Sequence, residues 1–200
     1  MKKTLLSLAL VVTAAAAFAQ GKVGFVNDST RVFTMGTVLG SDAAFAGQAV
    51  PLAGLPSGGL SALLYAGTSA GSLSLQTAIP LTGTSLPIAG RMATKNVTLV
   101  GVPGSASASF QIIIVSSAAD VVNSIVGGTA SASTFANTSY FGTSGLFTFT
   151  PGASVTFPVI YAGTSTWAQG PVQINAVPEP TSMALAGLGA ASLLIFRRRK

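Results

Sequence analysis

The sequence predicts an all-β fold: a two-sheet antiparallel sandwich or jelly-roll-like domain, flanked by an N-terminal signal helix and a C-terminal membrane helix. Short apolar segments recur through the middle of the chain, and in several of them apolar and polar residues alternate with period two. The 23 glycines and 10 prolines supply turn residues between these segments. Many short strands with ample turn chemistry are typical of sandwiches and jelly rolls.

Residues 1–19 are predicted to be a signal peptide. A basic start at residues 1–3 precedes an apolar run at residues 5–18. Ala17 and Ala19 supply the small residues that signal peptidase requires, so we expect that enzyme to cleave before Gln20. A transmembrane helix is the alternative, but the run is short and a Gly-Lys pair follows it directly.

The exported domain, residues 20–176, contains nine segments with strand character. We expect strands at residues 22–25, 31–34, 60–65, 72–77, 97–102, 107–115, 146–150, 155–161 and 172–174, with residues 36–59 mostly loop. Pro158 has no amide hydrogen for a strand ladder, which places its segment at a sheet edge or a bulge.

The segment 107–115 has the clearest signature of a central strand. Phe110, Ile112 and Ile114 share one face, and Ile113 and Val115 share the other. A strand that is apolar on both faces is usually covered on both sides.

One segment favours a helix instead. Residues 118–126 follow Ser117, a capping residue, and precede Gly127-Gly128, a stop signal. In such a helix Asp120 would lie in the first turn, near the positive end of the helix dipole.

Each of the three tyrosines opens the sequence Tyr-x-Gly-Thr-Ser, at Tyr65, Tyr140 and Tyr161. One interpretation is a recurring strand-end turn, in which Tyr closes a strand and Gly adopts a positive φ. The other is a set of tyrosines that stacks on sugar rings together with Trp167.

The net charge of +6 does not predict nucleic-acid binding. Six of the ten basic residues lie in residues 1–3 and 197–200, the two terminal segments. Within the exported domain, residues 20–176, four basic side chains are balanced by three acidic ones, which leaves one net positive charge and no basic patch to replace counterions on a phosphate backbone.

The residue inventory favours a protein that is not an enzyme and holds no metal or other cofactor. The chain has no Cys and no His, so it lacks the usual zinc and copper ligands and cannot build a Ser-His-Asp relay. Its exported domain offers only Asp28, Asp42 and Asp120 as carboxylates. A glycosidase would need two of them at a set separation, but turn capping by Asp28 and Asp42 is the simpler expectation.

Three asparagines match the acceptor pattern for N-linked sugars. They are Asn27, Asn96 and Asn137, each followed two residues later by Ser or Thr. Such triplets arise readily by chance in a chain rich in Ser and Thr.

The last 24 residues, 177–200, combine three parts in order. Pro178, Glu179 and Pro180 hold the chain extended. An uncharged apolar run then extends from Met183 to Phe196, and the basic residues Arg197, Arg198, Arg199 and Lys200 close the chain. Basic residues beside an apolar helix stay on the cytoplasmic side. A plain membrane anchor is the alternative, but even counted from Thr181 to Phe196 the apolar run is only about 24 Å long as a helix.

This tail resembles a PEP-CTERM sorting signal. The resemblance implies recognition by an exosortase, a membrane-embedded cysteine peptidase, at or near Pro178-Glu179-Pro180. It also implies a Gram-negative bacterium that makes exopolysaccharide.

We therefore expect an exported, non-catalytic protein of the cell envelope or extracellular matrix. Its precursor would be anchored in the inner membrane with a cytoplasmic C-terminus before it reaches the cell surface or matrix. The alternative is a carbohydrate-binding module for exopolysaccharide, based on Trp167, Tyr161, Tyr140 and Tyr65.

Overall fold

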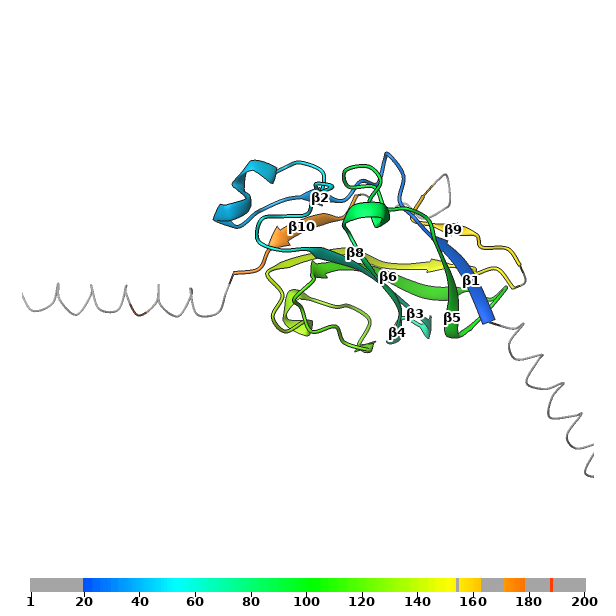
Figure 1. The fold of residues 1–200 in the computed structure, drawn as a ribbon. Helices are drawn as coiled ribbons and strands as arrows, with labels where there is room; N and C mark the ends of the chain where they lie inside the picture. Colours follow the sequence, from blue (N-terminus) through cyan, green and yellow to red (C-terminus); the bar gives the residue numbers. More distant parts are fainter. Residues whose placement is uncertain (1–19, 154, 163–170, 179–187, 189–200) are drawn as a thin grey trace, which may run out of the picture.

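The computed structural model describes residues 20–153, 155–162, 171–178 and 188, and these form a mostly β structure with two sheets (Figure 1). The strands are β1 (Gln20–Phe25), β2 (Thr34–Met35), β3 (Leu60–Ser69), β4 (Ser72–Pro80), β5 (Lys95–Pro103), β6 (Ala108–Ser116), β7 (Ser124–Val126), β8 (Tyr140–Phe149), β9 (Val159–Ile160) and β10 (Gln173–Ala176). Three short 3-10 helices are described as well: η1 (Gly40–Phe45), η2 (Gly83–Ser85) and η3 (Ala132–Thr134).

The larger sheet has the strand order β2-β10-β8-β6-β3-β4-β7, and the smaller has the order β5-β1-β9. The predicted purely antiparallel arrangement is wrong at two places, because β10 pairs with β2 and β1 pairs with β9 in parallel. Both parallel contacts are two residue pairs long and join strands that are far apart in sequence. Parallel neighbours need such long crossovers, which no local sequence pattern reveals.

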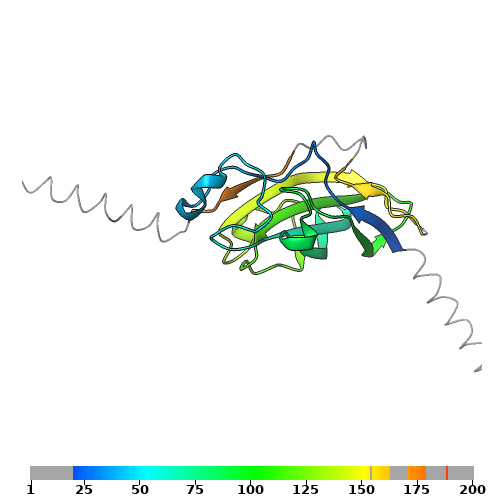
Figure 2. The ribbon, with the colours of Figure 1, turned by 45° about the horizontal axis from the view of Figure 1, so that its top comes forward.

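The main core lies between the two sheets. Figures 1 and 2 show the smaller sheet over one end of the larger one, while the loops that carry η1 and η2 lie over the rest. Val23 and Phe25 of β1 are buried against Leu64 of β3 and the inward face of β6, which carries Phe110 and Ile112.

A second cluster covers the opposite face of the larger sheet. Leu63, Tyr65 and Ile113 pack there with Phe135, which comes from the segment between β6 and β8. Every residue of β6 is buried, and β6 is the middle strand of its sheet. The prediction of a central strand at residues 107–115 is therefore confirmed.

The predicted helix at residues 118–126 is wrong. The end of this segment is β7, which pairs with the edge of β4 through Ser72–Val126 and Leu73–Ile125. Ile125 is buried in the second cluster. Its apolar spacing fits a helix equally well, but the open edge of β4 offers backbone partners that only the tertiary fold supplies.

The strand boundaries differ most from the prediction in three segments. The segment 31–34 is strand only at Thr34–Met35, and the segment 155–161 only at Val159–Ile160. Pro158 directly precedes β9, an edge strand, as expected. β8 begins at Tyr140, six residues earlier than expected, because glycines inside a strand pattern obscure it.

Candidate functional site at the end of the last strand

The described ectodomain holds its chain up to Val177, one residue before Pro178. β10 lies between β2 and β8 and buries Ile174 completely. The Ala176 amide donates to the Thr37 carbonyl at 2.8 Å, and the Val177 amide donates to the Ser139 carbonyl at 2.9 Å. Pro178 is exposed. No spacer therefore separates the folded sheet from the first residue of the Pro-Glu-Pro sequence.

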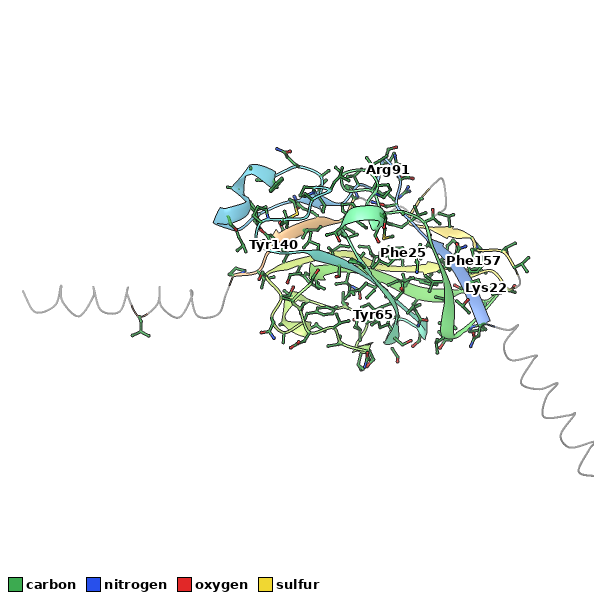
Figure 3. All side chains as sticks on the ribbon, viewed as in Figure 1. Lys22, Phe25, Tyr65, Arg91, Tyr140 and Phe157 are labelled. Carbon is green, nitrogen blue, oxygen red and sulfur yellow. The ribbon has the colours of Figure 1, made fainter. Side chains whose placement is uncertain are left out.

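The segments beside the point where the chain leaves β10 are held together by the buried carboxylate of Asp42 in η1. It accepts hydrogen bonds from the Ser57 hydroxyl, from the Ser57 amide at 3.1 Å and from the Tyr140 hydroxyl at 2.6 Å. The Tyr140 oxygen in turn accepts from the Leu39 amide at 2.9 Å. Asp42 thus joins η1, the turn at residues 51–58 and the start of β8, next to β10. Figure 3 shows Tyr140 at this end of the sheet.

The pKa values of this pair follow from burial and hydrogen bonding. Burial alone raises the pKa of Asp42, but the bonds from Ser57 and Tyr140 together outweigh it, so the pKa lies below its usual value. Burial and the bond to Asp42 raise the pKa of Tyr140. The expectation that Asp42 caps a turn is corrected, because it contributes no side-chain cap to η1 and instead joins distant segments.

The other two carboxylates have separate partners, local ones for Asp28 and a more distant one for Asp120. Asp28 accepts from the Thr30 amide at 2.9 Å and pairs with Arg31 at 3.0 Å, which confirms its turn-capping role. Asp120 accepts from the Asn137 side chain at 3.0 Å and is not in a helix, contrary to the prediction. Among the described residues no group of three His, Cys, Asp or Glu side chains could hold a metal ion.

All three tyrosines are buried, with exposures of 0% for Tyr65, 1% for Tyr140 and 0% for Tyr161. The Tyr65 hydroxyl donates to the Val122 carbonyl at 2.6 Å, and burial raises the pKa of Tyr65 to about 12. Tyr161 stacks on Phe33, and burial raises its pKa as well. None of the three rings is on the surface to stack on a sugar. Trp167 lies outside the described residues.

In the two Tyr-x-Gly-Thr-Ser repeats whose glycine the structure describes, that glycine does not have the predicted role. Gly67 lies within β3 and Gly142 within β8, and neither has a positive φ. Both are sites of close backbone approach: a Cβ on Gly67 would lie 2.1 Å from the Ser72 oxygen, and one on Gly142 would lie 2.8 Å from the Gln173 oxygen.

Replacing Gly67 with Ala should therefore destabilise the protein by about 2–3 kcal/mol, because the added methyl must displace backbone in the β3–β4 hairpin. Gly71→Ala in the same hairpin is the matched control, since its Cβ would meet nothing within 4 Å. Urea unfolding of both variants measures the difference. Equal midpoints would contradict the close-approach interpretation.

The three glycosylation triplets differ in accessibility. Asn27 is buried, with its amide nitrogen 2.7 Å from the Gly90 carbonyl and its oxygen accepting from the Met92 amide at 2.6 Å. It therefore serves as a link between two loops in this fold and is not an accessible acceptor. Asn96 and Asn137 are exposed.

Most residues of the predicted targeting segments lie outside the described residues: Ala17, Ala19, Glu179, Pro180, the run from Met183 to Phe196 except Leu188, and Arg197, Arg198, Arg199 and Lys200. Within the part of the chain that the structure describes, no helix has the length and hydropathy needed to cross a bilayer.

Comparison with known proteins identifies one segment. Residues 176–200 match the family model of the PEP-CTERM protein-sorting motif. No curated protein and no solved structure matches the chain. The chain is thus a PEP-CTERM domain-containing protein, and the motif implies export and exosortase-dependent sorting to the cell envelope.

Proposed function

We propose, from the PEP-CTERM motif at residues 176–200, that this chain is a non-catalytic protein of the cell envelope or extracellular matrix. The general secretory route exports it, signal peptidase removes residues 1–19, and an exosortase processes it at Pro178-Glu179-Pro180. Before processing, the apolar run from Met183 to Phe196 holds it in the inner membrane with a cytoplasmic C-terminus.

The position of the motif is the observation that carries this proposal. The match begins at residue 176, the last residue of β10, so the folded body and the sorting segment adjoin and share only Ala176. Because the ectodomain ends where the sorting segment begins, processing at the motif leaves the folded ectodomain intact.

The non-catalytic part of the proposal is supported by the side chains. The sequence has no Cys and no His. Asp28, Asp42 and Asp120 have disjoint sets of hydrogen-bond partners, and Asp42 is fully buried. The alternative of exopolysaccharide binding cannot use the three tyrosines, because all three are buried. Of its proposed stacking residues, it now depends on Trp167 alone.

Replacing Pro178, Glu179 and Pro180 with Ala should abolish exosortase processing, because the motif is then absent while the folded body is unchanged. Intact-mass measurement of the exported protein checks this: the variant should retain Lys200 and stay in the membrane fraction. Pro171→Ala, at an exposed proline outside the motif, is the control and should be processed normally. Unchanged processing of the triple variant would refute the proposal.

A further inference from the structure

The short connection to the sorting segment fixes which end of the ectodomain faces the membrane. Five residues separate Val177 from Met183, where the apolar run begins. Six Cα-to-Cα steps therefore join Val177 to Met183, and fully extended they span at most about 20 Å. The end of the sheet that carries Val177 therefore stays close to the bilayer as long as the apolar run is inserted.

The segment η1 lies at that same end. Figures 1 and 2 both show it beside the carboxyl end of β10, while β1 starts at the opposite end of the molecule. The Thr37 amide donates to the Asn175 side chain of β10 at 3.0 Å, and Thr37 leads directly into η1. The end of β10 and the segment that leads into η1 are therefore bonded to each other along one edge of the structure.

The surface of this edge is uncharged and weakly apolar. Ala43, Ala44 and Ala46 are exposed, and Phe45 is partly buried against the main core. The only charged group of η1, Asp42, is turned inward to Ser57 and Tyr140. The turn that Ser57 ties to η1 carries Leu52, which is 49% exposed.

The four basic side chains of the ectodomain lie outside η1: Arg31 pairs with Asp28 at 3.0 Å, and Lys95 is paired with Phe25 in the smaller sheet. Lys22 is at the opposite end, over the ring of Phe157 at 5.7 Å, and Arg91 is well separated from Tyr140 (Figure 3). The acid Asp120 accepts from the side chain of Asn137, which lies two residues before Ser139, the partner of the Val177 amide. This edge therefore offers no attraction to anionic headgroups, and its η1 face has no charge to desolvate.

We propose that this edge, formed by Ala43, Ala44, Phe45 and Ala46, rests on the outer surface of the bilayer in the anchored precursor. The inference depends on the proposed membrane insertion of the apolar run. Because the connection between Val177 and Met183 is short, the edge has a high effective concentration at the lipid surface, and even a weak contact is populated. The contact comes from apolar and uncharged groups, so it requires no anionic lipid and tolerates salt.

The absence of native cysteine makes the test direct. Single cysteines are introduced as Ala44→Cys on η1 and Ala106→Cys, a matched exposed alanine in the β5–β6 turn, next to Pro103, which pairs with Gln20 at the start of β1. The full chain is expressed with its signal in a host that lacks an exosortase, purified from the membrane fraction, labelled with a fluorophore and reconstituted in phosphatidylcholine vesicles that carry headgroup nitroxides. Flotation of the vesicles reports anchoring independently.

The probe at position 44 should be quenched at least about twofold more than the probe at 106, because ten-residue strands such as β3 separate the two ends by about 33 Å. The difference should persist when phosphatidylglycerol or 0.5 M salt, which shortens the Debye length to well under about 8 Å, is added. Equal quenching in floated vesicles, or a difference that needs anionic lipid, would overturn this inference alone. A chain that does not float would overturn the anchor and the inference together.

Discussion

Replacing Asp42 with Ala is expected to destabilise the ectodomain by about 3–5 kcal/mol, because it removes the shared partner of a buried network. The change leaves the hydroxyl of Tyr140, which is 1% exposed, without its acceptor, and frees the turn that holds Ser57. For a domain of this size the melting temperature should fall by about 6–15 °C. Thermal unfolding followed by circular dichroism measures the change.

Two variants separate the carboxylate's charge from its shape. Tyr140→Phe removes one donor and should lower the free energy of unfolding by about 2 kcal/mol, and Asp42→Asn keeps the shape but presents an amide to Ser57 or Tyr140. The double variant Asp42→Asn with Tyr140→Phe should be less destabilised than the sum of the two single variants. Simple additivity would mean that Asp42 and Tyr140 are not energetically coupled.

The carboxylate of Asp42 also makes the stability of the folded protein depend on pH in the acidic range. The pKa of Asp42 is lower in the folded state than in the unfolded chain, where it is about 3.9. Its contribution to stability is therefore complete above about pH 5 and is lost as the pH falls through the folded value. The stability gap between the native protein and Asp42→Asn should accordingly shrink between about pH 5 and pH 2. A constant gap would show that Asp42 does not titrate differently in the two states.

The sequence predicts those parts of the fold whose signal is local. The alternation of β4 and the two-sided apolar character of β6 were each visible within nine residues, and both strands are present. Turn capping by Asp28 was predictable because its partners are two and three residues away.

The parts that could not be predicted depend on contacts between distant segments. Asp42 and Tyr140 are 98 residues apart, and nothing near either residue indicates the other. The Tyr-x-Gly-Thr-Ser repeat suggested one shared role, yet Tyr65 packs in the second cluster and Tyr140 in the main core. Gly67 is constrained by Ser72 of its own hairpin, whereas Gly142 is constrained by Gln173 of β10, which comes from a later part of the sequence. The sorting segment could be recognised from the sequence because it is a linear motif. That no spacer separates it from β10 is shown only by the hydrogen bond of the Val177 amide.

Inserting six Gly and Ser residues between Val177 and Pro178 is expected to speed exosortase processing by more than about tenfold, since each 1.4 kcal/mol of removed opening cost is worth a factor of about ten. This prediction rests on the proposed processing at the motif. A peptidase that binds residues before the motif must detach β10 from the sheet, because the amides of Ala176 and Val177 are bonded to Thr37 and Ser139. Detaching β10 also exposes Ile174. The linker would supply an accessible segment without this local unfolding.

Ile174→Ala should act in the same direction without changing the length of the chain, because it weakens the packing of β10 and so lowers the cost of opening. The matched control inserts the same six residues at Gly71, in an exposed turn far along the chain from β10, and should leave the processing rate unchanged. Pulse-chase measurement of the precursor and product in the producing cell gives the rates. If neither the linker nor Ile174→Ala speeds cleavage, the enzyme needs only residues from Pro178 onward, and β10 stays paired while the tail is removed.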